Sequence, residues 1–209
     1  MNPSPSSTLS PKANSDLFDQ SALSDLAQRL VEAARRAGAD AADAVAVRGV
    51  SQGVEVRDGR VEESERSEGD DVGLRVLVGQ RQAVVSTNDV SGDAVTKLAE
   101  RAVAMARVAP DDKYVGLADP ALLARDFPDL DLLDPDVPAT AELERRALEA
   151  EAAALAVKGV TKSGGASASA GIGGMVLVTS TGFHGSYLRS SQGISATAIV
   201  GEMPWLERR

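Results

Sequence analysis

The sequence predicts an α+β fold, a mostly antiparallel sheet with about three helices on one face. Three stretches repeat apolar residues at spacings of three and four, the helical period, and the stretches between them alternate with the strand period of two. The strands come in runs separated by single helices, which favours an antiparallel sheet over a parallel one. Hydrophobic residues make up 43% and charged residues 25% of the chain, ordinary values for a globular protein that can bury a core.

The first helix is expected from Ser21, as its capping residue, to a stop at Gly38. Its apolar residues fall on one helical face and are Leu23, Leu26, Ala27, Leu30, Val31, Ala34 and Ala37. Alanines and valines then alternate over residues 42–47, which predicts a strand buried on both faces.

Two hairpins are expected next. Residues 54–61 are predicted to form a strand, a turn at Asp58-Gly59 and a returning strand, because Asp-Gly tolerates the positive φ angles of a tight turn. Residues 74–78 lead into a turn at Gly79-Gln80, and residues 83–87 return, so about five short strands result.

An acidic run interrupts this strand region. Carboxylates could bind Ca²⁺ or Mg²⁺, but the spacing matches no calcium loop, and we favour a solvated strand edge that discourages association of sheets. The residues are Glu62, Glu63, Glu65, Glu68, Asp70 and Asp71.

A second helix is expected from Ser91 to about Val108, stopped by Pro110, with Val95, Leu98, Ala102, Met105 and Ala106 on its inner face. Residues 111–138 contain prolines and repeated Asp-Leu pairs, which predicts an ordered but irregular crossing loop. A third helix is expected over residues 139–157, stopped by Lys158-Gly159. Its inner face is predicted to be Leu143, Ala147, Ala150 and Ala154, with Leu148 and Leu155 beside it.

The last part of the chain is rich in glycine, serine, alanine and valine. The glycines of residues 164–174 miss the spacing of a dinucleotide-binding loop, and we interpret them as a hairpin with small side chains. Residues 175–178 and 194–200 are predicted strands, and their apolar surface is expected to be partly uncovered and to promote association.

Composition excludes several functions. The formal charge of −9 argues against duplex DNA as a partner, and 3% aromatic residues leave few rings for stacking on single-stranded nucleic acid. The chain has no cysteine, which fits a cytoplasmic location, and its single histidine cannot form a His-based zinc site alone. No apolar run approaches the roughly 20 residues that span a membrane. Residues 1–20 are predicted to be a disordered tail.

Two groups of polar residues are candidate sites. Ser86, Thr87, Asn88 and Asp89 lie where a strand meets a helix and could contact a peptide or another subunit, although helix capping is the commoner role of such residues. His184 lies near Ser180 and Ser186, but a nucleophile elbow is missing, and a serine hydrolase is disfavoured. The residues alone therefore predict no catalytic, cofactor-binding or metal-ligating residue.

Several strings, taken in order over about residues 24–203, resemble the TldD/PmbA family, also called modulator of DNA gyrase proteins. They are Val54-Glu55-Val56-Arg57-Asp58-Gly59-Arg60-Val61-Glu62, Gly73-Leu74-Arg75-Val76, Ser86-Thr87-Asn88-Asp89, Ala104-Met105-Ala106-Arg107, Asp111-Asp112-Lys113-Tyr114-Val115-Gly116-Leu117, Asp129-Leu130-Asp131-Leu132-Leu133-Asp134-Pro135 and Thr179-Ser180-Thr181-Gly182-Phe183-His184-Gly185-Ser186-Tyr187. The Asp-Leu-Asp-Leu string favours the PmbA (TldE) branch.

The resemblance implies a cytoplasmic subunit that pairs with a homologous TldD/PmbA subunit and acts on unfolded peptides. In that family, zinc is held by an HExxxH helix in the C-terminal half, and this sequence has no such motif. The resemblance thus implies an N-terminal domain over residues 21–158 and a strand-rich central segment over residues 159–209 that stops before the metal-bearing half. We expect a non-catalytic part of a zinc metallopeptidase, without direct nucleic-acid or membrane binding. A stand-alone binding or adaptor module is the alternative.

Overall fold

The protein is described by a computed structural model that covers residues 19–201. One antiparallel sheet has the strand order β3-β2-β1-β4-β5. The elements are α2 (Ser21–Arg36), β1 (Ala41–Arg57), β2 (Arg60–Val78), β3 (Arg81–Thr87), α3 (Gly92–Val108), a 3₁₀ turn η1 (Pro120–Leu122), α4 (Thr140–Leu155), β4 (Val160–Thr179) and β5 (His184–Val200). The predicted α+β class with three α-helices is confirmed for these residues. Most of the predicted tail, residues 1–18, lies outside the described part.

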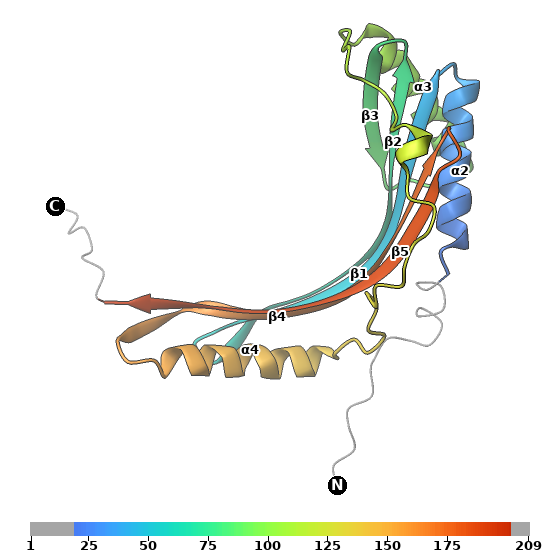
Figure 1. The fold of residues 1–209 in the computed structure, drawn as a ribbon. Helices are drawn as coiled ribbons and strands as arrows, with labels where there is room; N and C mark the ends of the chain where they lie inside the picture. The colour runs from blue at the N-terminus through green and yellow to red at the C-terminus, as the bar shows by residue number, and fades with distance from the viewer. Residues whose placement is uncertain (1–18, 202–209) are drawn as a thin grey trace, which may run out of the picture.

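The sheet is strongly curved, and the helices lie on its convex side (Figure 1). Every second residue of β1 from Ala42 to Val56 points to the helices and is buried there, except the partly buried Arg48 and Gln52. Val45 and Val47 point the other way and are only half-buried. The expectation of a strand buried on both faces is therefore wrong, because helices cover one face only. We call the uncovered, concave side the open face.

The strands are also longer than expected. Residues 42–57 form one strand instead of two, and β2 runs unbroken through the acidic stretch. The glycine-rich residues 164–174 lie inside β4, so the predicted hairpin there is wrong. The strand persists because β4 is paired on both sides, with β1 and with β5, and these ladders satisfy its backbone groups.

Two separate hydrophobic cores lie under the helices. The first packs α2 and α3 on β1, β2, β3 and the end of β4, and we call this region the two-helix arm. The second packs α4 alone on the later half of β1 and the first half of β4, and we call it the one-helix arm. In α3, Val103 is buried and Met105 is 45% exposed, which corrects the predicted inner face.

The arms meet in the curved middle of the sheet, which we call the bend (Figure 1). Gly69, Gly49 and Gly173 stand side by side there on β2, β1 and β4. Because glycine has no side chain, a row of three leaves nothing to resist curvature toward the open face. On the helix side of the bend, Arg48 donates two hydrogen bonds of 2.7 Å to Asp70, so a polar pair separates the two cores.

Helix α4 buries a charged residue where alanine was expected. Glu151 is 3% exposed, whereas Ala150 and Ala154 are only half-buried and Leu155 is 41% exposed. Its carboxylate accepts hydrogen bonds from the backbone N–H groups of Asp58, at 3.0 Å, and Gly59, at 2.9 Å, and from the hydroxyl of Ser163. The hydroxyl of Ser163 and the N–H groups lower the pKa of Glu151, because they bond the charged form. We call this group the Glu151 clamp.

The clamp holds the predicted hairpin turn. Asp58 and Gly59 have φ angles of 52° and 72°, which confirms the Asp-Gly turn between β1 and β2. Gly38 and Gly159, with φ of 100° and 97°, end α2 and α4 as expected. Ser21 is the first residue of α2 and makes no cap, because Gln20 occupies the capping position.

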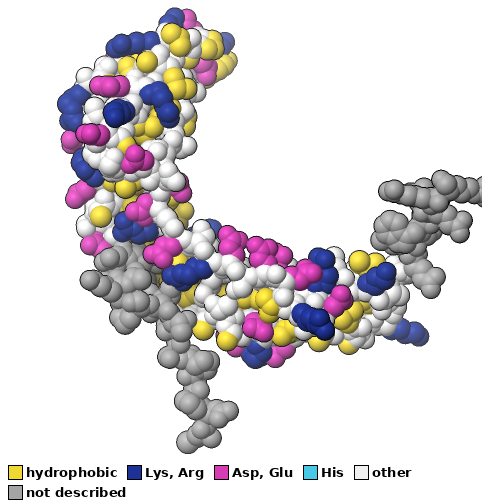
Figure 2. All heavy atoms as spheres, turned by 180° about the vertical axis from the view of Figure 1, so that it is seen from behind, with side chains coloured by type: hydrophobic (Ala, Val, Ile, Leu, Met, Phe, Trp, Pro, Cys, Tyr) yellow, Lys and Arg dark blue, Asp and Glu magenta, His cyan; other side chains and the backbone are white. Residues whose placement is uncertain are grey.

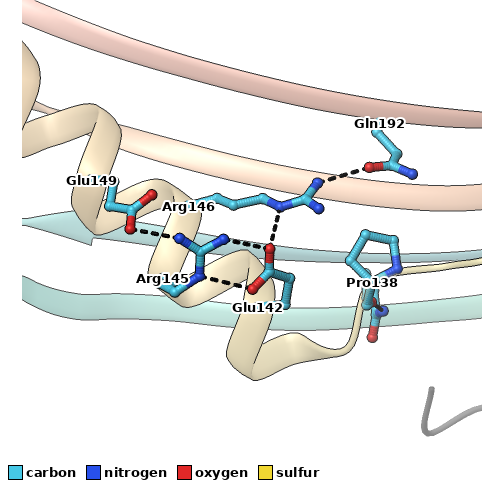
Figure 3. Close-up of polar contacts among 7 residues, drawn as sticks. Pro138, Glu142, Arg145, Arg146, Glu149 and Gln192 are labelled. Carbon is cyan, nitrogen blue, oxygen red and sulfur yellow. Dashed lines mark hydrogen bonds and ion pairs between the residues drawn. The ribbon is translucent and has the colours of Figure 1, made fainter. Parts of the chain in front are cut away.

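An ion-pair cluster on α4 links that helix to β5 (Figure 3). Arg145 bridges Glu142 and Glu149 along one side of the helix, and Arg146 joins Glu142 to Gln192 of β5, at 2.7 and 2.8 Å. The guanidinium groups of Arg145 and Arg146 lower the pKa of Glu142 to about 2, because both bond its carboxylate. The cluster is exposed and orients α4 more than it stabilises the fold.

Candidate functional site

The open face is the broadest uncovered surface of the sheet, and strand register orders its side chains in rows. Ser86, Gly73, Val45, Leu177 and Gly185 form one row across all five strands. The glycine row at the bend continues to Arg189 on β5. Two depressions lie on this face, and they share Met175 and Tyr187.

The first depression, which we call the hollow, lies at the bend and has a volume of about 540 Å³. Its floor includes the glycine row and Gly171, and its sides include hydroxyls and charges. Ser51, Ser67 and Ser191 lie at one end, and Asp71 and Tyr187 lie at the other. Arg189 lies between them, in the glycine row. Because the floor has no side chains, an object in the hollow can approach the sheet backbone closely.

The second depression, which we call the groove, has a volume of about 600 Å³ and is lined mainly by apolar side chains. One wall is the open face of β4 and β5, and the other is the crossing loop over residues 127–133. Its apolar residues are Phe127, Pro128, Leu130, Leu132, Leu133, Met175, Leu177, Phe183, Tyr187 and Leu188. Volumes of roughly 300 to 1,000 Å³ are typical of ligand sites.

Several contacts hold the loop beside β5. The N–H of Ser190 donates to the carbonyl of Leu132 at 3.0 Å, and the N–H of Asp134 donates to the Ser190 hydroxyl at 2.9 Å. At the other end of the groove, the rings of Phe127 and Phe183 meet edge to face with centroids 6.2 Å apart. The prediction of an ordered but irregular loop is confirmed.

The four polar residues singled out in the sequence lie at the opposite edge of the sheet. Ser86 is exposed at the end of β3, in the same row as Leu177 and Gly185 but on the far strand. The Thr87 hydroxyl accepts the N–H of Asp89, and Asp89 accepts the N–H of Ser91, each at 3.0 Å. The Ser91 N–H lowers the pKa of Asp89. These bonds shape the entry to α3, and a contact of Ser86, Thr87, Asn88 and Asp89 with a peptide or subunit stays a prediction.

His184 belongs to a different group from the nearby serines. Its Nε2 lies 3.0 Å from the hydroxyl of Ser24 on α2, and Ser180 accepts the N–H of Ala42 at 3.0 Å. Ser186 lies two residues along β5 from His184. The structure records no hydrogen bond from His184 to Ser180 or Ser186 within residues 19–201, so it assembles no nucleophile and base there.

The zinc that the family resemblance implies does not fit the described residues. No three His, Cys, Asp or Glu side chains between residues 19 and 201 are grouped to hold a metal ion. The acidic run instead lies on the part of β2 that pairs with β1 alone, since β3 pairs only with residues 72–78. The expectation of a solvated strand edge is confirmed. Figure 2 shows acidic side chains grouped on the inner side of the one-helix arm.

Sequence reasoning missed both depressions. The Asp-Leu-Asp-Leu string predicts a loop and a family branch but no ligand site, although its leucines, 66% exposed at Leu130, are the sequence signal of the groove. The hollow depends on three glycines from three strands, whose alignment requires the register. Among the described helices, none is long and apolar enough to cross a membrane.

Comparison with models of protein families identifies the family of this chain. The model of the PmbA/TldA metallopeptidase domain 1 matches residues 42–106, and that of the PmbA/TldA metallopeptidase central domain matches residues 131–208. Together they cover more than half of the chain. This chain belongs to the PmbA/TldD family.

Individual relatives of known family support this assignment. The chain is 39% identical over 182 residues to a metalloprotease PmbA homolog of Haemophilus influenzae and 33% identical over 156 residues to metalloprotease PmbA of Escherichia coli O157:H7. These matches cover 85% and 74% of this chain, but 39% and 35% of the relatives. The chain thus spans about two fifths of their length.

Two crystal structures share the fold. A protein described as a modulator of DNA gyrase from Bacteroides thetaiotaomicron matches with a TM-score of 0.75 and 21% identity, over 87% of this chain and 42% of that one. TldE from Thermococcus kodakarensis matches with a TM-score of 0.67 and 13% identity, over 85% and 40%. At these identities the likeness supports the fold.

Proposed function

We propose that this chain is a non-catalytic part of a PmbA/TldD-type zinc metallopeptidase subunit in the cytoplasm, that its open face forms a wall of the substrate chamber, and that it pairs with a homologous subunit. The observation that carries the proposal is the open face itself. It is concave, it is not covered by helices, and its two depressions adjoin. An unfolded polypeptide is the substrate that such an elongated surface accommodates.

The hollow supports a polypeptide ligand in particular. A glycine floor lets an extended chain lie close to the sheet, while Ser51, Ser67 and Ser191 offer hydroxyls to its backbone amides. Zinc, where the family supplies it, would polarise a peptide carbonyl and activate water. Residues of this chain would hold the substrate in place.

The wall function is tested by filling the hollow. A Cβ added at Gly69 meets nothing within 4 Å, so the side chain of Gly69→Trp starts in open space and is placed to fill the hollow. The probe is fluorescein-labelled, reduced and carboxymethylated α-lactalbumin, an unfolded polypeptide, and binding is followed by fluorescence anisotropy. We expect Gly69→Trp to weaken binding and Val61→Trp, an exposed β2 position that does not line the hollow, to leave it unchanged. Equal affinity of wild type and Gly69→Trp would contradict the proposal.

The non-catalytic role is tested separately with the same probe and added zinc. We expect no cleavage by the purified chain. Cleavage that a chelator abolishes, with one zinc bound per chain, would show that its own residues hold a catalytic metal.

In the one-helix arm, which β3 does not reach, the two free edges of the sheet are β2 and β5, and they favour pairing through β5. The β2 edge carries the acidic run, which discourages another strand from pairing there. Residues 191–200 of β5 carry no charge, and Ile194 and Val200 are 56% and 73% exposed. An uncharged, exposed edge is a template for a partner strand. We propose that the homologous subunit docks at this edge.

This docking can be measured with a second copy of the chain as the partner. We expect wild-type protein to associate as its concentration rises in light scattering coupled to gel filtration. Ile194→Lys should remain monomeric, because a lysine blocks edge pairing, and Val61→Lys on β2 should behave as wild type. Association of Ile194→Lys at wild-type concentrations would exclude the β5 edge.

A further inference from the structure

We propose that the groove binds a large apolar side chain of an extended peptide whose flanking residues are basic. The inference deepens the proposed function and rests on it in one respect, that the ligand is a polypeptide. It adds a place on the open face and a class of peptide sequence.

The groove is apolar and accessible at the same time. Phe127, Leu130 and Leu132 are 60%, 66% and 44% exposed, although they face the apolar residues of β4 and β5 across a volume of about 600 Å³. Leaving such side chains in water is unfavourable, and an apolar side chain entering the groove removes this surface from water. The groove therefore favours a ligand group of the size of Phe, Leu or Met.

The groove is also held open by the fold. Ser190 and the Leu132 carbonyl fix its loop wall to β5, and the Phe127 and Phe183 rings close one end. Within the loop, the carboxylate of Asp129 accepts the N–H of Asp131 at 3.0 Å. Because these contacts lie within the chain itself, binding costs little ordering of the wall.

Charge at the rim selects the ligand. Residues 126–136 contain five aspartates and no lysine or arginine. Two of the aspartates, Asp129 and Asp131, line the groove itself. This negative rim repels fatty acids and acidic peptides, which would otherwise suit an apolar cavity, and attracts lysine or arginine beside the buried side chain. The ligand that matches the apolar walls and the negative rim is a peptide segment with both apolar and basic side chains.

The test uses three fluorescein-labelled five-residue peptides with the full chain. Lys-Phe-Lys-Leu-Lys carries both features, Lys-Ser-Lys-Ser-Lys lacks the apolar side chains, and Glu-Phe-Glu-Leu-Glu reverses the charge. We expect the first to bind at least about tenfold more tightly than either of the others, since each loses one class of contact. Equal affinity for the first two peptides would overturn the apolar part of the inference.

Substitutions locate the binding. Leu130→Ser removes apolar surface at an exposed position, and we expect it to weaken binding of Lys-Phe-Lys-Leu-Lys about fivefold or more. Leu122→Ser, at an 83% exposed leucine outside the groove, is its matched control and should change binding less than about twofold.

The rim charge has its own pair of variants. Asp131 has a φ of 51°, a conformation that asparagine also tolerates, so Asp131→Asn removes the charge without straining the loop. We expect weaker binding of Lys-Phe-Lys-Leu-Lys at low salt and a smaller loss at high salt, because salt screens exposed charges. Asp136→Asn, an exposed position that does not line the groove, is the control.

The outcomes separate this inference from the proposed function. If unfolded α-lactalbumin binds and Gly69→Trp weakens it, but Leu130→Ser and Leu122→Ser bind Lys-Phe-Lys-Leu-Lys like wild type, the groove is not the site and the wall function stands. If neither the unfolded protein nor any peptide binds, both proposals are wrong.

Discussion

The two arms of the sheet are built by different means. In the two-helix arm, α2 and α3 together bury a large core with leucines and valines from five elements. In the one-helix arm, α4 contributes Leu143 and Ala147 as its buried apolar residues, and much of the sheet beneath is alanine. The smaller core is supplemented by the Glu151 clamp, which ties α4 to the hairpin turn.

This difference shows how one sheet face can use two sources of stability. Where two helices cover the strands, burial of apolar surface suffices. Where one helix covers them, the buried carboxylate adds charge-assisted hydrogen bonds from two backbone N–H groups of a turn. The polar pair Arg48–Asp70 stands between the arms, so neither core extends into the other.

The largest effects are expected from matched leucine truncations in the two cores. Leu74 and Leu143 are 0% and 1% exposed, and each Leu→Ala change should lower the free energy of unfolding by about 3 kcal/mol. If the arms are separate, Leu143→Ala will speed hydrogen exchange in α4 and leave α2 and α3 protected, and Leu74→Ala will do the reverse. Faster exchange in both arms for either variant would show that they unfold as one unit.

Removal of the clamp should cost less. Glu151→Ala removes the charged acceptor of the N–H groups of Asp58 and Gly59, and we expect a loss of about 2 kcal/mol in the free energy of unfolding, measured with urea. Glu149→Ala, two residues earlier on an exposed side of α4, loses only a surface ion pair and should cost less than about 0.5 kcal/mol. Equal losses of unfolding free energy for Glu151→Ala and Glu149→Ala would show that the hydrogen bonds of the clamp do not stabilise the fold.

The bend offers a pair of glycines that differ in their surroundings. A Cβ on Gly171 would lie 2.8 Å from the Val50 carbonyl oxygen, so Gly171→Ala should lower stability by about 1 to 2 kcal/mol as the strands shift. A Cβ on Gly69 meets nothing within 4 Å, and Gly69→Ala should be neutral or raise stability by up to about 0.5 kcal/mol. Thermal unfolding of the two variants compares them, and a destabilised Gly69→Ala would show that the bend needs its glycine row.

The smallest effect is the pH dependence of the clamp. Hydrogen bonds lower the pKa of Glu151 below its ordinary 4.5, so the folded state binds this proton less readily than the unfolded state. The stabilisation is complete above pH 4.5 and is lost as pH falls through the lower folded pKa. We expect the stability difference between wild type and Glu151→Gln to be constant from pH 6 to 8 and to shrink below pH 4.5. A difference independent of pH would assign the effect to packing.

Prediction from the sequence succeeded where the signal was local. The Asp58-Gly59 turn, the Gly38 and Gly159 stops and the irregular loop follow from chemistry within a few residues. It failed where the partner was distant. The buried face of α4 includes Glu151, because a turn almost a hundred residues earlier supplies its hydrogen-bond donors. The spacing of apolar residues along the helix carries no information about such a distant partner.

The sequence by itself determined the α+β class, the order of the three helices and the acidic strand edge, because periodicity and composition act along the chain. Only the tertiary structure decided which face of the sheet stays open, where Gly69, Gly49 and Gly173 align, and that the crossing loop and β5 enclose the groove. These features depend on strand register and on contacts between residues far apart in sequence, and such contacts form only when the chain is folded.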